Sequence, residues 1–378
     1  MLERNIFTEE QDQFRQTVSK FVDKEIQPYH NKWENSGCVP KDLWLKAGEI
    51  GLLCPNIPKK YGGIGGDFRF NVIVIEELAK VGATGPGFAV HSDIVTPYII
   101  NYGTTKQKML YLSKMAKGEL ITAIAMTEPN TGSDLQNIKT NALIKENKII
   151  LNGSKTFITN GQNAHLVLVI AKTDLSKKAK GISIILCEDF RKGFKRGKNL
   201  EKIGMKAQDT SELFFDNIEL PIDNILGSSG QGFTQLMDEL PQERLSIAVT
   251  AVAAAEAALK WTVSYAKERV AFDKKIIDFQ NTKFTLAKLK AEIKVARTFI
   301  DKCINDHIGN SFSAEDGAIA KLWCTELQFK VMDKCLQLFG GYGYMQEYPI
   351  AKAFLDARVQ RIYGGTNEIM KEIISRNL

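Results

Sequence analysis

The first third of the chain has the apolar spacing of amphipathic helices. After Thr8, the side chains of Phe14, Val18 and Phe21 recur every three or four residues and so share one helix face. Thr8 suits an N-cap, and Gln11 three residues later completes a capping-box pattern. Further helices are expected over residues 41–50, 70–81 and 105–116. Residues 1–120 are therefore predicted to form an N-terminal helical domain.

Around residue 120 the hydrophobic period becomes that of strands. Short apolar or β-branched runs are separated by Asn, Gly, Asp and Pro, which favour turns. The runs cover residues 121–126, 141–144, 148–151, 155–159, 166–171, 182–186 and 212–215. Asn147 lies between two of them, at the position of a hairpin turn. The spacing predicts an antiparallel β-barrel or sandwich domain over residues 121–228.

Beyond residue 228 the helical period returns and continues to the end of the chain. Residues 245–271 are rich in Ala and carry few charges, which is typical of a helix with little exposed surface. Three more helices are expected over residues 279–303, 315–339 and 348–362. Residues 229–378 are predicted to form a four-helix bundle, which makes the protein α+β. The four long helices have more apolar surface than one core requires, so an oligomer interface is expected.

Composition and charge narrow the class of protein. The chain has 378 residues, 44% hydrophobic and 25% charged, which suits a folded protein of two or three domains. Its net charge is +6, and the densest basic stretch is 191–198. A solvated loop beside an anionic ligand explains that stretch better than a nucleic-acid arm. No apolar run reaches the ~18 residues of a membrane helix, and no signal-peptide pattern opens the sequence.

Several common site chemistries find no support in the sequence. The six Cys form no C-x-x-C pair, which favours free thiols in a reducing compartment. The four His form no H-E-x-x-H motif, so no metal site is predicted. G-x-S-x-G, G-x-G-x-x-G and the P-loop motif are all missing, which argues against a serine hydrolase and against Rossmann or P-loop nucleotide binding.

Three groups of polar, glycine-containing segments are left as candidates to cradle an anion or a flat ring. They are residues 125–134, residues 157–161, and the pair 337–344 and 363–369. Hydroxyls and free backbone N–H groups in such segments bind phosphates or heterocycles. Each segment also has a structural explanation: a tight turn, a core Phe with its neighbour, and helix caps formed by Gly and Thr. Taken alone, 125–134 is better explained as a turn.

Taken together, these segments resemble those of the acyl-CoA dehydrogenase family of flavoproteins over essentially the whole chain. The helical, β, helical order matches as well, as do residues 265–272 and 279–280. The resemblance implies FAD as the cofactor and acyl-CoA as the substrate. It also implies a homotetramer built as a dimer of dimers, and electron-transferring flavoprotein as the electron acceptor. The expected location is the cytoplasm of a bacterium, or alternatively the mitochondrial matrix.

The resemblance also assigns site residues. Those implied to bind the cofactor are Met126, Thr127, Gly132, Ser133, Phe157, Ile158, Thr159, Arg269, Gln280, Gln337, Leu338, Phe339, Gly340, Gly341, Thr366, Asn367 and Glu368. Phe157 stands where the family usually has Trp and would pack on the flavin, with Thr159 near flavin N5. Arg269, Gln280 and 337–341 would bind the FAD of a neighbouring subunit. Substrate contacts would come from Ser133, Arg244, Tyr363, Gly364 and Gly365.

The catalytic base needs a separate assignment. Many family members carry Glu at the position of Gly364, where this chain has no carboxylate. Long-chain and isovaleryl-type members place the Glu on the helix after the β domain, and residues 240–245 fit that placement. We therefore assign Glu243 as the base, with Glu239 one helical turn earlier as the alternative. Without the resemblance, the residues alone favour a different interpretation, in which Glu243 is a solvated acid near a helix start. The loop 363–369 resembles the long-chain type, and the Gly364 N–H is a candidate to polarise the thioester carbonyl.

The expected reaction is α,β-dehydrogenation of an acyl-CoA to a trans-2-enoyl-CoA, as in fatty-acid β-oxidation. By the resemblance, the base removes the α proton and the β hydrogen leaves as hydride to flavin N5. Medium, long or branched acyl chains are the expected substrates. The alternatives are a flavin oxidase or monooxygenase on the same scaffold, and a non-catalytic protein that has kept the fold.

Overall fold

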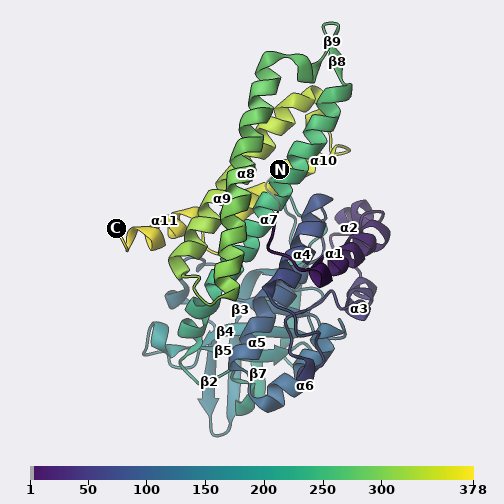
Figure 1. The fold of residues 1–378 in the computed structure, drawn as a ribbon. Helices are drawn as coiled ribbons and strands as arrows, with labels where there is room; N and C mark the ends of the chain where they lie inside the picture. The colour runs from purple at the N-terminus through teal and green to yellow at the C-terminus, as the bar shows by residue number, and fades with distance from the viewer. Residues whose placement is uncertain (1–3) are drawn as a thin grey trace.

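Three structural parts follow one another along the chain, as the change of hydrophobic period predicts (Figure 1). The computed structural model describes residues 4–378. The helices of the first part are α1 Glu9–Phe21, α2 His30–Ser36, α3 Lys41–Glu49, α4 Phe68–Lys80, α5 Thr96–Tyr102 and α6 Thr105–Ala116. A π-helical segment, η3 (Val90–Val95), leads directly into α5. The helical character of the N-terminal part is thereby confirmed.

The start of α1 is set by the capping box that the sequence predicts. The Thr8 hydroxyl accepts a hydrogen bond from the Gln11 backbone N–H, and the Gln11 side chain accepts one from the Thr8 N–H. Two N–H groups that have no partner inside the helix are thus satisfied. Thr104 and Gln107 start α6 in the same way.

A seven-stranded sheet forms the middle part. Its strands are β1 Thr122–Ala125, β2 Asn141–Lys145, β3 Lys148–Thr159, β4 Leu166–Lys172, β5 Ile182–Glu188, β6 Phe194–Asn199 and β7 Thr210–Pro221. Their order is β1-β4-β2-β3-β7-β6, with β5 also paired to β4. Most pairs are antiparallel, whereas β4 runs parallel to both β1 and β2. The β character predicted for this part is confirmed.

Two local predictions in the sheet were wrong. The runs 148–151 and 155–159 are one strand, β3, in which the pairing with β7 shifts after Leu151, near Gly153. The basic stretch 191–198 was expected to be a loop, but most of it lies in β6, which pairs with β7 at the edge of the sheet. An edge strand leaves its charged side chains in water, so a basic sequence is compatible with it.

Long helices dominate the last part. They are α7 Gly232–Glu268, α8 Gln280–Ile308, α9 Ala314–Phe339, α10 Pro349–Ala357 and α11 Asn367–Ser375. The short strands β8 (Val270–Ala271) and β9 (Lys274–Lys275) form a hairpin at the end of the bundle far from the sheet (Figure 1). The expected helix 245–271 begins earlier, at Gly232, and continues through Pro241. The expected helix 348–362 ends its α-helical part at Ala357.

Helix α7 lies at the centre of the fold. Within residues 4–378 it is the helix long and apolar enough, by length and composition, to cross a membrane. However, 56% of that apolar window is buried inside the protein. Its small side chains, such as those of Ala251 and Ala255, are buried in the core that it shares with α8 and α9. This is the burial expected of a core helix.

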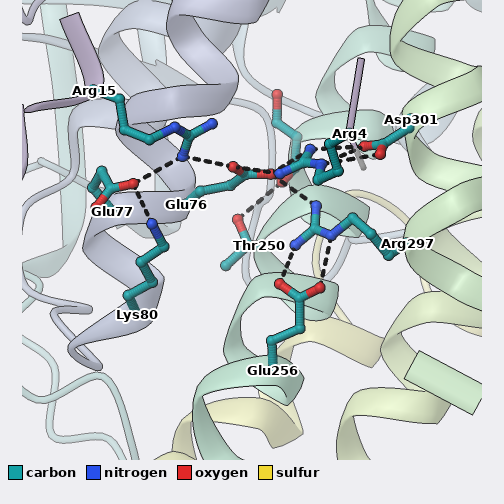
Figure 2. Close-up of polar contacts among 10 residues, drawn as sticks. Arg4, Arg15, Glu76, Glu77, Lys80, Thr250, Glu256, Arg297 and Asp301 are labelled. Atoms are coloured by element: carbon teal, nitrogen blue, oxygen red, sulfur yellow. Dashed lines mark hydrogen bonds and ion pairs between the residues drawn. The ribbon is translucent and has the colours of Figure 1, made fainter. Parts of the chain in front are cut away.

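A cluster of charged side chains around the buried Glu76 joins α1, α4, α7 and α8 to the N-terminal segment (Figure 2). Its members, which we call the charge cluster, are Arg4, Arg15, Glu76, Glu77, Lys80, Glu256, Arg297 and Asp301. The Glu76 carboxylate is at its centre and pairs with Arg4, Arg15 and Arg297 at 2.8–3.0 Å. Basic and acidic members are equal in number, so their charges compensate one another around the buried Glu76.

Candidate active site

Helix α7 carries the predicted base on a buried face. Glu243 is 5% exposed, and its Oε1 accepts a hydrogen bond of 2.9 Å from the Tyr98 hydroxyl of α5. Arg244 and Ile247 belong to the same stretch of helix, and Ile247, four residues on, lies on the Glu243 face. This stretch of α7 thus combines a buried carboxylate, a cation and an apolar side chain.

The surroundings of Glu243 favour proton exchange at neutral pH. Burial raises the pKa of this carboxyl to about 7, and the nearby Glu239 charge acts in the same direction. The Tyr98 hydrogen bond and the Arg244 charge oppose the rise. A base works best when its pKa lies near the working pH, because it must both take up and release a proton. The carboxyl of Glu243 therefore has the properties of a general base.

The alternative base, Glu239, is held differently. Its Oε1 accepts a hydrogen bond of 2.7 Å from the Asn101 side chain at the end of α5. Burial also raises the pKa of this carboxyl. The loop that contains Gly364 contacts α7 at Arg244 and Ile247, on the C-terminal side of Glu243. Glu243 is therefore the nearer of the two carboxylates to this loop along the helix.

The geometry around Gly364 disfavours a side chain there. Gly364 and Gly365 have φ of +65° and +89°, a region that L residues other than Gly rarely adopt. A Cβ at Gly364 would lie 2.5 Å from Cδ1 of Ile247. The Gly364 carbonyl accepts a hydrogen bond of 3.4 Å from Nε of Arg244. The loop thus lies against α7 beside Glu243, and a side chain at position 364 would combine a strained positive φ with a required shift of the Ile247 side chain.

A buried lysine of α9 fixes the same loop from the other side. Nζ of Lys321 donates to the Gly365 carbonyl at 2.8 Å and to Oδ1 of Asn367 at 2.9 Å. Burial lowers the pKa of Lys321 to about 8, and the Arg244 charge contributes. The Asn367 amide also donates to Glu326, at 2.8 Å. Because the Asn367 side chain faces inward, any cofactor contact at this residue would come from its backbone.

A second buried lysine supports the predicted flavin-contacting loop after β1. Nζ of Lys155 donates to the Met126 carbonyl at 2.8 Å and pairs with Glu128 at 3.0 Å. The Glu128 carboxylate also accepts two backbone N–H groups, those of Lys139 and Thr140. Burial lowers the pKa of Lys155 to about 8, although the Glu128 charge opposes this. Lys155 therefore anchors the loop 126–133 to β3. It lies two residues before Phe157, where the predicted ring-binding segment begins.

The exposed groups of the middle part suit a flat, polar ring system such as that of FAD. Phe157 is 67% exposed with φ of +60°, so its ring stands out of the sheet next to the half-buried Thr159. Gly132 has open space where a Cβ would be, and Ser133 is exposed. An exposed aromatic face offers a stacking surface, and hydroxyls beside it offer hydrogen-bond donors and acceptors, as such a ring needs. The side chain of Ile158 is buried, so any cofactor contact at this residue would come from its backbone.

A second set of predicted cofactor residues, Arg269, Gln280 and 337–341, gathers at the far end of the bundle. The Arg269 guanidinium lies 5.8 Å from the Tyr342 ring centroid, and no atom lies within 4 Å of a Cβ built at Gly340 or Gly341. Gln280 and Gln337 are exposed, Leu338 is half-buried, and the buried Phe339 ring stacks on Tyr265 at 4.2 Å. Figure 1 shows this end well separated from the sheet. Within one chain, therefore, the structure does not bring the two groups together.

The last segment lies at the start of α11. Thr366 is its N-cap, and its hydroxyl accepts a hydrogen bond from the Ile369 N–H at 3.3 Å. Glu368 is exposed in the first turn, and Tyr363 is half-buried. The structure thus gathers Glu243, Arg244 and the loop 363–366 around one turn of α7.

Comparison with known proteins supports, along the whole chain, the family that the sequence resembles. Family models match at residues 8–119 (acyl-CoA dehydrogenase, N-terminal domain), 123–218 (middle domain) and 230–378 (C-terminal domain). The long-chain specific acyl-CoA dehydrogenase of Rattus norvegicus mitochondria is 51% identical, covering 99% of this chain and 88% of its own. A short-chain specific acyl-CoA dehydrogenase of Clostridium acetobutylicum is 37% identical, covering 97% of each chain. The crystal structure of an acyl-CoA dehydrogenase from Geobacillus kaustophilus superposes with a TM-score of 0.97 at 47% identity, covering 99% of each chain.

Fold and site together define a flavoprotein oxidoreductase. The chain belongs to the acyl-CoA dehydrogenase family. It is an FAD-dependent enzyme of fatty-acid metabolism that dehydrogenates acyl-CoA.

The sequence did not reveal three residues that shape this site. Tyr98, Lys155 and Lys321 are buried and hydrogen-bonded to predicted site residues. Lys155 and Phe157 are two apart in β3, yet one is buried and the other exposed, because the pairing with β7 shifts between Lys155 and Ile158. Simple strand alternation would place both on one face.

Proposed function

We propose that the enzyme converts medium- or long-chain, or branched, acyl-CoA to trans-2-enoyl-CoA, with Glu243 as the base. The observation that carries this proposal is the buried carboxylate of Glu243 beside a loop that has Gly, and so no side chain, at position 364. A carboxylate on α7 takes the place of one on the loop, where the positive φ of Gly364 and the nearby Ile247 side chain disfavour any residue but Gly.

The residues of the chain have separate roles in this reaction. Glu243 accepts the proton that leaves the α carbon, while the electron pair of that C–H bond begins the new double bond. In this proposal the N–H of Gly364 stabilises negative charge on the thioester oxygen, which makes the α proton more acidic. Bound FAD supplies the acceptor for the β hydrogen, which leaves as hydride. The buried setting of Glu243 excludes water from its carboxylate.

The test compares two carboxylates of one helix. Glu243→Gln is expected to keep yellow, FAD-loaded protein but to lose bleaching of the flavin by acyl-CoA, because an amide cannot accept the proton. Glu239→Gln is the matched control and should bleach at a near-normal rate. Normal bleaching by Glu243→Gln would refute the assignment. Loss of bleaching only in Glu239→Gln would assign the base to Glu239 instead.

Chain-length preference calls for direct measurement, because relatives of this chain are named for both long-chain and short-chain substrates. The Tyr363–Glu368 segment resembles that of long-chain members, which supports medium or long chains. A series of acyl-CoAs from short to long, including branched ones, tests this. The highest kcat/KM should fall on medium, long or branched chains, and a maximum on butyryl-CoA would contradict the proposal.

We also propose a homotetramer, a dimer of dimers. One group of predicted cofactor residues belongs to the β domain and another lies near the β8–β9 hairpin, which Figure 1 shows far from the sheet, so we infer that a complete site needs a second subunit. Large apolar side chains on α8 and α9, those of Phe284, Val295 and Trp323, are more than half exposed in the single chain. Covering such residues favours association. Light scattering should give four times the chain mass, and a monomer that retains FAD would refute this.

Electron-transferring flavoprotein is the proposed acceptor, as the family suggests. The reduced enzyme should then be reoxidised quickly by that protein and slowly by oxygen. Steady oxygen consumption without an added carrier would instead favour a flavin oxidase. We place the enzyme in a bacterial cytoplasm, with the mitochondrial matrix as the alternative, since relatives of both origins match the chain.

A further inference from the structure

Helix α5 faces the carboxylates of α7 with a row of hydrogen-bond donors. The pairs are Tyr98 with Glu243 (2.9 Å), Asn101 with Glu239 (2.7 Å) and Tyr102 with Asp238 (3.3 Å). These contacts lie on both sides of Pro241, which lacks the N–H that would bond within the helix. The backbone of α7 thus lacks one hydrogen bond at Pro241, two residues before Glu243, and side chains of α5 contact the helix on both sides of it.

The pair of Tyr98 and Glu243 differs from the other two in its burial. Tyr98 is fully buried and Glu243 nearly so, whereas Tyr102 is half-buried. Burial, together with the Glu243 charge, raises the pKa of the Tyr98 hydroxyl well above 10, so this hydroxyl keeps its proton and donates it. In the described part of the chain, Tyr98 is the side chain that hydrogen-bonds the Glu243 carboxylate, and it contacts Oε1 alone.

We propose that Tyr98 is a positioning residue for the base: its hydroxyl holds Oε1 of Glu243 and so leaves Oε2 directed to the α carbon of the substrate. The inference rests on the proposed role of Glu243. A buried carboxylate without such a partner would rotate between several orientations, whereas a fixed one is already near the geometry that proton transfer needs. Tyr98 itself neither gains nor loses a proton in the reaction.

Other charged groups face this pair and set the baseline for its pH dependence. Glu239, Arg244 and Asp238 belong to α7 itself. The neighbouring Gln242 contacts η3 and α8, where its amide donates to the Asp93 carbonyl and its oxygen faces Nε2 of His307. From α9, Lys321 lies near Arg244. All of these remain when the Tyr98 hydroxyl is removed, so a change in pH profile reports on that hydroxyl.

The experiment is flavin reduction by acyl-CoA in the full-length holoenzyme, followed by stopped flow across a pH series. For Tyr98→Phe we expect the limiting reduction rate to fall about 10- to 100-fold, the usual effect of losing a hydrogen bond to a charged group. Loss of the donor raises the pKa of Glu243, so the midpoint of the rate profile should move upward by about one pH unit. The apparent acyl-CoA dissociation constant should change little.

Tyr102→Phe is the matched control, since it removes a hydroxyl from the same helix that donates to Asp238 instead. It should change the rate less than about twofold, with no pH shift. An unchanged rate and profile for Tyr98→Phe, or equal changes in both variants, would overturn the inference. Should Tyr98→Phe not retain FAD, 3-fluorotyrosine at position 98 serves instead. Its hydroxyl is more acidic and so a stronger donor, and the midpoint of the rate–pH profile should therefore move downward. An upward or absent shift overturns the inference.

The outcome is separable from that of the proposed function. If Glu243→Gln is inactive while Tyr98→Phe behaves as the native enzyme, only the positioning role fails. If Glu243→Gln still reduces its flavin, the base assignment fails, whatever Tyr98→Phe shows.

Discussion

Glu76→Gln tests how far the charge cluster stabilises the junction of α4, α7 and α8. The Glu76 side chain is 2% exposed and pairs with Arg4, Arg15 and Arg297 (Figure 2). The substitution keeps the size of the side chain but removes its charge. It leaves three guanidinium groups without their shared carboxylate, so a large loss of stability is expected.

The magnitude follows from the pKa of this carboxyl. Burial disfavours the charge, but Arg297, Arg4 and Arg15 outweigh it and lower the pKa from 4.5 to about 2. At about 1.4 kcal/mol per tenfold change, that corresponds to about 3 kcal/mol of stability at neutral pH. Breaking a buried ion pair typically costs 3–5 kcal/mol, which agrees.

The pH dependence has a definite sign. Because the pKa of Glu76 is lower in the folded protein, its contribution is fully present above about pH 5 and is lost as the pH falls toward 2. Urea unfolding of the native enzyme and of Glu76→Gln should therefore differ by about 3 kcal/mol at pH 7, and the difference should shrink on acidification.

Glu219→Gln provides the control. Glu219 pairs with Lys148 at a similar distance, 2.9 Å, but both side chains are more than 60% exposed. A pair in water contributes about 0–1 kcal/mol, so this variant should unfold almost as the native protein does. If Glu76→Gln lost less than about 1 kcal/mol, or if its loss were the same at pH 7 and pH 4, the reasoning would be refuted.

Three further substitutions address the loops of the site. Lys155→Met leaves the buried Glu128 unpaired and should lower the FAD content per chain, measured from flavin and protein absorbance, at a cost of about 3–5 kcal/mol in stability. Gly364→Glu introduces strain of about 1–3 kcal/mol at a positive φ and should not restore flavin bleaching to Glu243→Gln; restored bleaching would contradict the crowding at this loop. Lys321→Met removes the donor to the Gly365 carbonyl and to the buried Asn367 side chain, so thermal unfolding should show a loss of about 1–3 kcal/mol, together with weaker acyl-CoA binding in titration.

Local sequence determined the elements of the fold. The period of apolar residues separates the helical parts from the sheet, and the Thr8–Gln11 capping box sets the start of α1, because both depend on neighbours within a few residues. Where the local signal was weak, the prediction failed. The basic residues of β6 resemble a loop, and only pairing with β7 makes them a strand.

The sequence by itself supplied the family, the cofactor and the candidate base, since these depend on which residue types occur and in what order. Only the tertiary structure decided what surrounds them. Tyr98 meets Glu243 across 145 positions of the chain, and Lys321 meets Gly365 across 44. No local pattern encodes such contacts, because they arise when distant helices pack together. Burial, which sets the pKa of Glu243 near 7, is a property of that packing and so belongs to the fold rather than to the residue.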